Sequence, residues 1–143
     1  MESSLIIGID AGPLAAAFNR KDPHHRWVLE TFKQLAGPFY TSESVLSETL
    51  FLLDRNNVAS ESLLEMLERG AVRIGFDPKL HMSNLIALIR RYADQPMSLA
   101  DATLVRLAEL HENATIFTLD RHFRIYRKHG RRQIPLIIPE HVK

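Results

Sequence analysis

The sequence predicts an α/β protein in which helices cover both faces of a central, mostly parallel sheet. Short apolar runs rich in β-branched and aromatic residues recur along the 143-residue chain, at residues 5–9, 39–41, 115–119 and 136–138. Between these runs, apolar residues are spaced by three and four positions, as on the inward face of a helix. Since 45% of the residues are hydrophobic, the chain can bury a core of its own, and we expect residues 1–143 to form a single domain.

Start and stop signals divide the first half of the chain into elements. Asp22-Pro23 places an N-cap and a first-turn proline ahead of a helix. Ser42 or Ser44 can cap a second helix, and Gly70 can end a third. The predicted elements are a strand at residues 5–9, a turn at 11–13, helices at 14–18 and 24–35, a strand at 39–41 and helices at 42–54 and 60–69.

The second half has the same alternation. Asp77-Pro78 repeats the helix-start signal. Ser98 and Asp101 have the spacing of a capping box, in which the serine hydroxyl and the acid satisfy backbone donors at the helix start. The predicted elements are a strand at residues 72–76, helices at 77–92 and 98–111, a strand at 115–119, a basic helix at 121–128 and a strand at 136–138.

Four acidic residues stand where the apolar pattern would otherwise continue. Asp10 and Asp120 each follow a predicted strand, at the edge of a parallel sheet where ligands bind. Glu48 and Asp101 lie in predicted helices, on faces that are otherwise apolar. A capping role alone would also explain Asp101, and a solvated position at the rim of its helix face would also explain Glu48. If the four acids meet, they form one carboxylate cluster at the carboxyl edge of the sheet.

A cluster of carboxylates in a partly dry cleft requires a cation, because like charges at close range repel one another. The chain has no cysteine, so a metal ion would be held by oxygen or imidazole ligands. Carboxylates and water suit Mg²⁺ or Mn²⁺ better than Zn²⁺. Such ions can bind a phosphate oxygen and activate a water molecule, which favours phosphodiester hydrolysis.

In these motifs the sequence resembles the PIN-domain ribonucleases. The resemblance covers essentially the whole chain and rests on a strand ending in Asp10, on Glu48 in S-E-T-L, on Asp101 in S-L-A-D-A and on Asp120 in T-L-D. It implies a Rossmann-like, three-layer α/β/α sandwich and an endoribonuclease dependent on Mg²⁺ or Mn²⁺. By the same resemblance Asp10 and Asp101 are the main metal ligands, Glu48 and Asp120 complete the catalytic cluster, and the hydroxyl of Thr118 supports it.

The resemblance also implies partners. Relatives are often Vap-type toxins that cut RNA, are restrained by an antitoxin protein and form homodimers. One departure keeps a second interpretation open: many relatives have a hydroxyl residue after the first aspartate, where this chain has Ala11-Gly12. The alternative is therefore a catalytically weak or inactive PIN-like module that binds RNA or a protein. A receiver-like phosphoacceptor domain is disfavoured, because the paired acids it needs after the first strand are missing.

Charge alone identifies no partner, since 18 Lys and Arg residues face 17 Asp and Glu residues, for a net charge of +1. Basic residues do gather late in the chain, where they could bind RNA phosphates or simply solubilise an exposed helix: Arg121, Arg124, Arg127, Lys128, Arg131 and Arg132. The histidines are expected on the surface: His24, His25, His122 and His129. We expect Asp94 at a solvated helix end, and Trp27 and Phe32 in the core.

No basic leader and no apolar run long enough to span a bilayer is seen in the sequence. We therefore expect a cytoplasmic protein with no membrane partner.

Overall fold

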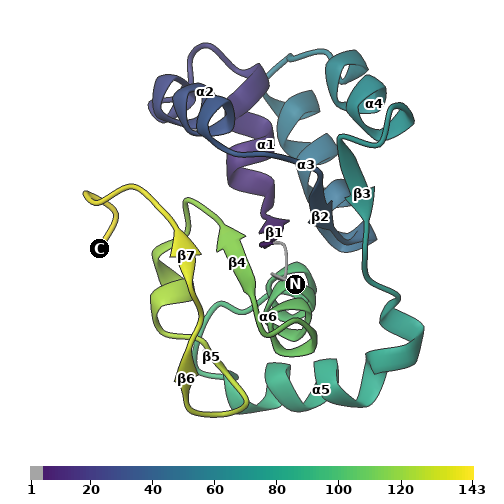
Figure 1. Ribbon diagram of the computed structural model, residues 1–143, viewed down its shortest axis with the longest axis vertical. Helices are drawn as coiled ribbons and strands as arrows, with labels where there is room; N and C mark the ends of the chain where they lie inside the picture. The colour runs from purple at the N-terminus through teal and green to yellow at the C-terminus, as the bar shows by residue number, and fades with distance from the viewer. Residues whose placement is uncertain (1–4) are drawn as a thin grey trace.

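The computed structural model describes residues 5–143, and within them five strands form one sheet in which every neighbouring pair runs parallel (Figure 1). The strand order is β3-β2-β1-β4-β7. These strands are β1 (Ile6–Ile9), β2 (Phe39–Thr41), β3 (Val72–Ile74), β4 (Ala114–Phe117) and β7 (Leu136–Ile137). The predicted parallel sheet is confirmed; residues 1–4 of the predicted domain lie outside the described part.

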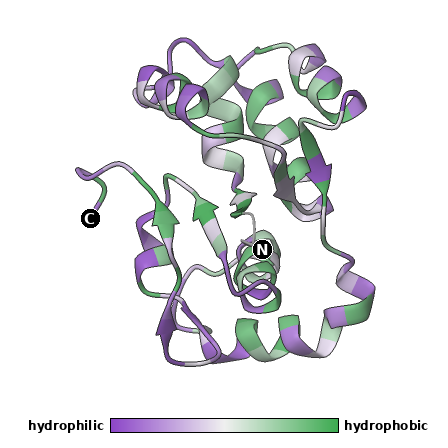
Figure 2. Ribbon diagram, in the orientation of Figure 1, coloured by the Kyte–Doolittle hydropathy of each residue, from purple (hydrophilic) through white to green (hydrophobic). Residues whose placement is uncertain are grey.

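The helices form the two outer layers of the sandwich. Those on one side of the sheet are α1 (Ala11–Phe18), α2 (His25–Gln34), α3 (Glu43–Arg55) and α4 (Glu61–Glu68); those on the other are α5 (Met82–Arg91) and α6 (Leu99–Leu110) (Figure 1). Hydrophobic residues concentrate on the strands and on the helix faces turned toward them (Figure 2). The predicted three-layer α/β/α architecture is confirmed. In residues 5–143 we find no helix with the length and apolar character needed to cross a bilayer.

The order of the strands defines where a ligand site would form. The chain leaves β1 toward β2 on one side and later returns to pair β4 with the other side of β1. In a parallel sheet, the crevice at the carboxyl ends of the strands where this reversal occurs is the usual ligand site. Residues that directly follow β1 and β4 therefore border that crevice.

Close packing of α6 on this part of the sheet depends on Gly8 in β1. A Cβ atom at Gly8 would lie 2.8 Å from Leu107 Cδ2 and 2.8 Å from Ile116 Cδ1, which is closer than van der Waals contact allows. A glycine in the strand lets the side chains of α6 approach the backbone. The helix that carries Asp101 is thus held directly against the strand that leads to Asp10.

Two predictions in the first half are wrong. Ala11, Gly12 and Pro13 do not form a turn but the first turn of α1, whose N-cap is Asp10. A proline is tolerated there because the N–H groups of a first turn have no helical acceptor. The next helix begins at His25, later than predicted, because Asp22 organises a preceding turn by accepting the His24 N–H at 2.8 Å.

Two predictions in the second half also fail. The single helix predicted at 77–92 is divided into a 3₁₀ turn, η1 (Pro78–His81), followed by α5. The predicted basic helix at 121–128 is a short 3₁₀ turn, η2 (Arg121–Arg124), followed by an antiparallel hairpin of β5 (Arg127–Lys128) and β6 (Arg132–Gln133). Left-handed φ angles of 53° at His129 and 79° at Gly130 close this hairpin where a helix would have continued.

Candidate active site

Asp10 lies at the junction of β1 and α1, at the centre of the carboxyl edge of the sheet. Its Oδ1 accepts the Ala11 N–H at 2.8 Å, and its Oδ2 accepts the Thr118 hydroxyl at 2.7 Å. The residue is only 6% exposed. Burial raises the pKa of Asp10 to about 7, and the nearby charge of Asp101 contributes to this rise, although the Thr118 hydrogen bond opposes it.

Thr118 and Asp120 come from the segment that follows β4. The Thr118 hydroxyl bridges the two acids, because it donates to Asp10 and accepts the Asp120 N–H at 3.0 Å. Asp120 begins η2 and is less buried, with 36% of its side chain exposed. Its Oδ1 accepts both the His122 backbone N–H at 2.9 Å and the His122 Nδ1–H at 2.7 Å.

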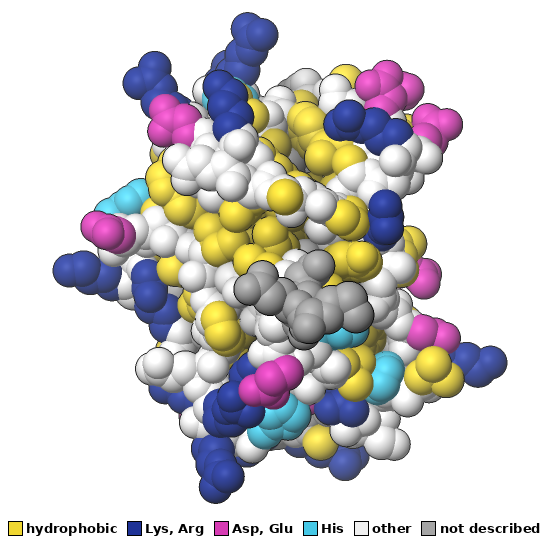
Figure 3. All heavy atoms as spheres, in the orientation of Figure 1, with side chains coloured by type: hydrophobic (Ala, Val, Ile, Leu, Met, Phe, Trp, Pro, Cys, Tyr) yellow, Lys and Arg dark blue, Asp and Glu magenta, His cyan; other side chains and the backbone are white. Residues whose placement is uncertain are grey.

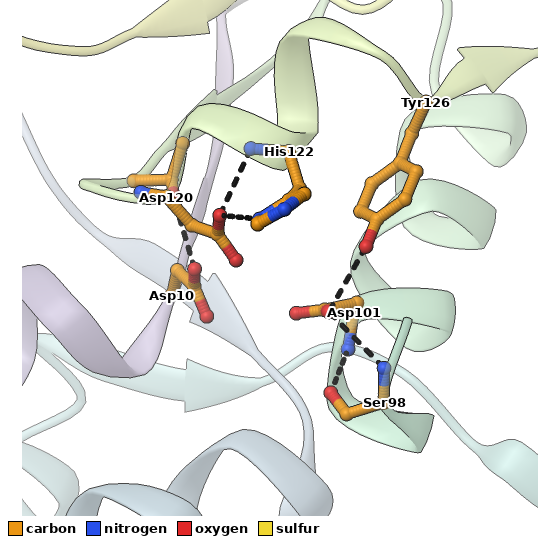
Figure 4. A network of polar contacts seen from close by, with 7 residues as sticks. Asp10, Ser98, Asp101, Asp120, His122 and Tyr126 are labelled. Carbon is orange, nitrogen blue, oxygen red and sulfur yellow. Dashed lines mark hydrogen bonds and ion pairs between the residues drawn. The ribbon is translucent and has the colours of Figure 1, made fainter. Parts of the chain in front are cut away.

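Asp101 reaches the same space from the first turn of α6. Its Oδ2 accepts the Ser98 N–H at 3.1 Å, and its own N–H donates to Ser98 Oγ at 3.0 Å, so the predicted capping box is confirmed. The Tyr126 hydroxyl lies 3.4 Å from the same Oδ2. Asp101 is 7% exposed, and burial, with the charge of Asp120, raises its pKa. Capping uses one carboxylate oxygen and leaves Oδ1 facing the side of Asp10 (Figure 4).

Glu48 stands at the rim of the cluster on α3. This helix is fixed against α6 by Ser42, which accepts the Val45 N–H and lies 2.8 Å from the Thr103 hydroxyl. The side chain of Glu48 is exposed, as the solvated-rim interpretation expects. Even so, partial burial and the charges of Asp101 and Asp120 raise the pKa of Glu48, so it lies within electrostatic reach of the other acids.

The structure therefore brings all four predicted acids within electrostatic reach of one another. Figure 4 shows Asp10, Asp101 and Asp120 around an open space between β1, η2 and α6. No three Asp, Glu or His side chains in residues 5–143 are arranged to hold a metal ion together as they stand. Mg²⁺ is usually bound by one or two carboxylates and keeps several of its waters. Two buried carboxylates of raised pKa, Asp10 and Asp101, fit that mode of binding.

Sequence reasoning missed two contributors to this network. His122 was predicted to be a surface residue, and its side chain is indeed 26% exposed, but the prediction missed the contact of its ring with Asp120. Tyr126 is fully buried, and its hydroxyl reaches Asp101. The spacing of Asp120 and His122 is a signal that could have indicated a local turn held by the aspartate. Tyr126 gave no such signal, because its contact joins the segment between η2 and β5 to α6, 25 residues away in the sequence.

The structure also changes the interpretation of the basic segment. Arg124 donates to the Val142 carbonyl, Arg127 donates to three carbonyls of its own turn, and Arg132 pairs with Glu112 at 2.8 Å. Lys128 is buried. Lys and Arg side chains are spread around the outline of the face in Figure 3 and do not form one patch there. Within residues 5–143, the side chains of Arg121, Lys128 and Arg131 form no ion pair with an acid, and of these three only Arg121 and Arg131 are exposed.

The departure at Ala11-Gly12 does not leave Asp10 without a hydroxyl partner, because Thr118 supplies one from the neighbouring strand. A small residue at position 12 also has a packing reason: a Cβ on Gly12 would lie 3.3 Å from Leu119 Cβ. Because glycine has no side chain, the first turn of α1 can lie close to the end of β4.

A parallel α/β sandwich with carboxylates grouped at the switch point of its sheet has the place and the ligand chemistry for a divalent metal ion. The chain belongs to the PIN-domain family, whose model matches residues 7–128. The resemblance to PIN-domain ribonucleases is thereby confirmed.

Two relatives agree with this assignment. The chain is 32% identical over 125 residues to ribonuclease VapC26 of Mycobacterium tuberculosis, a match covering 85% of this chain and 93% of that protein. Its fold is similar to the crystal structure of VapC20 from Mycobacterium tuberculosis, described as a toxin that cleaves the sarcin-ricin loop. That match has a TM-score of 0.67 and 21% identity, and covers 77% of this chain and 86% of the other.

Proposed function

We propose that this protein is an endoribonuclease that hydrolyses RNA phosphodiester bonds with Mg²⁺ or Mn²⁺, within one domain spanning residues 1–143. The observation that carries the proposal is the burial of Asp10 and Asp101 beside each other at the switch point. In the described residues, no Lys or Arg pairs with any of the four acids. A divalent cation would supply the missing positive charge.

Each residue then has a role that follows from its position. Asp10 and Asp101 would hold the ion, and Thr118 orients Asp10. A bound divalent ion supplies polarisation of a phosphate oxygen and a lowered pKa of bound water. Glu48 lies at the open side with a raised pKa, which suits a carboxylate that accepts a proton from the attacking water. Asp120 completes the cluster from η2.

We also propose that the protein is the toxin of a toxin-antitoxin pair and acts in the cytoplasm, where its RNA substrate and an antitoxin partner would be found. The similarity to a VapC ribonuclease and to the fold of a VapC toxin supports this proposal. Induced expression in a bacterial host should stop growth, and an Asp101→Asn variant expressed to the same level should not. Growth arrest by both proteins would contradict a toxic effect of RNA cleavage.

A homodimer is the further partner we propose. Phe51 on α3 and Leu99 at the start of α6 are 63% and 44% exposed, and both line a groove with Glu48 beside the acids. A second copy packed there would remove these apolar side chains from water. Light scattering should give twice the monomer mass for the wild type and the monomer mass for Phe51→Ser. A monomeric wild type at micromolar concentration would exclude this assembly.

The enzymatic proposal is tested by incubating purified protein with a panel of RNAs in Mn²⁺, Mg²⁺ or chelator. The matched control is Asp101→Asn, which retains an oxygen for the capping box but loses the charge. Cutting that requires metal and is lost in the variant would support the nuclease. RNA binding without cutting, and no rise in melting temperature with either metal, would favour the inactive binding module.

A further inference from the structure

Of the three aspartates in the cluster, Asp120 is the one whose orientation is least constrained by packing. Its side chain is 36% exposed, and it is the N-cap that precedes the short turn η2, outside any long helix or strand. A partly exposed carboxylate samples several rotamers unless hydrogen bonds select one. For Asp120 to act with Asp10 and Asp101, something must fix the direction of its second oxygen.

His122 provides two donors to one oxygen of that carboxylate. The backbone N–H of His122 lies 2.9 Å from Asp120 Oδ1, and the ring Nδ1 lies 2.7 Å from the same atom. A separation of 2.7 Å is in the range of charge-assisted hydrogen bonds. Because both donors engage Oδ1, the other oxygen is left pointing into the space that Asp10 and Asp101 border (Figure 4).

Asp101 is held in the same way as Asp120. Asp101 is held through Oδ2 by Ser98 and Tyr126, which leaves its Oδ1 facing the common space. Asp120 is held through Oδ1, which leaves its Oδ2 facing that space. In these two acids one oxygen is tethered and the other is free, which is what a site needs if its carboxylates are to bind a hydrated cation in a fixed geometry.

We propose that His122 is a positioning residue of the active site, which uses its Nδ1–H to aim Asp120 at the ion and the scissile phosphate. This inference rests on the proposed nuclease function. The imidazole, and not the turn alone, is the essential part, because the backbone N–H by itself restricts rotation of the carboxylate about the Cβ–Cγ bond less than two donors do.

Local packing makes the proposal testable by substitution. The next residue, Phe123, is 1% exposed and packs edge-to-face on Tyr126 with ring centroids 5.2 Å apart. Since Phe123 anchors η2 in the core, replacing the His122 side chain should leave the turn folded. The backbone donor to Asp120 also persists in every variant, so the comparison isolates the imidazole.

Two variants distinguish the two ring nitrogens. In His122→Asn the side-chain amide nitrogen occupies the position of Nδ1, whereas in His122→Gln it occupies that of Nε2. Under single-turnover conditions we expect the His122→Asn variant to cut RNA at a rate within about threefold of that of the wild type. We expect the rate of RNA cleavage to fall about 10- to 100-fold in the His122→Gln variant. This variant should also need more Mn²⁺ for half-maximal cutting, as is usual when a partner of a metal-site acid is removed. His111→Gln, on the exposed end of α6, is the control and should cut as the wild type does.

A second readout does not depend on cleavage. Long-range ¹H–¹⁵N spectra of the full chain report which ring nitrogen of His122 carries the proton, with the His122→Asn spectrum identifying the signal. A proton on Nδ1 supports the tether, and an Nδ1 without one overturns it because that nitrogen could not donate to Asp120. Wild-type activity in His122→Gln would also overturn the proposal. An inactive wild type with a protonated Nδ1 would instead contradict the nuclease function and leave the tether supported.

Discussion

The four acids form an inner pair and an outer pair that are held in different ways. The inner pair, Asp10 and Asp101, is 6% and 7% exposed. It is bound by backbone N–H donors at two helix starts and by the hydroxyls of Thr118 and Tyr126. The outer pair, Glu48 and Asp120, retains contact with water. Burying an acid raises its pKa and costs folding free energy, and both effects are smaller for an exposed acid. The inner pair should therefore control both stability and metal binding, and the outer pair activity alone.

The largest effect is expected from removing an inner charge. Asp10→Asn should lower RNA cleavage about a thousandfold, since a ligand that binds the ion contributes several kcal/mol to the transition state. The rise in melting temperature with Mn²⁺ should disappear as well. Both are measured on purified protein, with Glu48→Gln as the comparison variant. A melting temperature that still rises with Mn²⁺ would place the ion elsewhere.

The second prediction concerns pH and the stability of the metal-free protein. The pKa of Asp10 is about 7 in the folded protein against 3.8 for an unperturbed group. Between these values the folded state keeps a proton that the unfolded chain has released, so the free energy of unfolding falls as pH rises from 4 to 7. The loss attributable to Asp10 is about 4 kcal/mol and is complete above pH 7.

Melting temperatures in chelator from pH 4 to 8 would measure this slope. Asp10→Asn, which cannot titrate, should flatten it, and Mn²⁺ should oppose it because metal binding favours the ionised acid. Equal slopes for Asp10→Asn and the wild type would show that the inner pair does not determine stability.

Substitutions in the outer pair should lower activity and leave stability nearly unchanged. Glu48→Gln is expected to lower the rate of cleavage about a hundredfold, as for loss of a general base. Its free energy of unfolding should change by less than about 0.5 kcal/mol, because the side chain is exposed. Kinetics and urea unfolding on one preparation test both expectations. A large loss of stability would show that Glu48 belongs with the inner pair.

A smaller loss of cleavage is expected when the Thr118 hydroxyl, which links the inner pair to the outer pair, is removed. Thr118→Val removes the hydroxyl that joins Asp10 to Asp120 while keeping the volume of the buried side chain. Cleavage should fall about tenfold, a typical value for a hydrogen bond to a charged group. Because this hydrogen bond lowers the pKa of Asp10, the acid limb of the pH–rate profile should move to higher pH. Thr118→Ser should retain both properties.

The smallest effect on activity is expected from a substitution outside the cluster, at Arg121. Arg121 is exposed next to Asp120 and forms no ion pair with an acid of the described residues, so it can meet an RNA phosphate. Arg121→Gln should raise KM for RNA about threefold and reduce the salt dependence of binding by roughly one unit of slope. Arg127→Gln is the control, since that guanidinium already binds carbonyls of its own turn and should affect stability instead. An unchanged salt slope in Arg121→Gln would exclude the contact.

Much of the molecule was determined by local sequence. The apolar run before Asp10, the capping pair Ser98 and Asp101, and the cap at Ser42 each specify an element through interactions within a few residues, and each was predicted correctly. The four acids could be selected because a charge on an apolar face is costly and needs a reason.

Only the tertiary structure decided how these acids differ. Their burial, the Thr118 bridge across strands and the contact from Tyr126 to Asp101 join residues far apart in the sequence. The basic segment shows the same limit: its spacing suits a helix, but pairing of β5 with β6 and the anchoring of Phe123 made it a turn and a hairpin. Residues separated along the chain meet only when the sheet has formed. For that reason the sequence could identify the carboxylates, and the fold alone set their protonation and their direction.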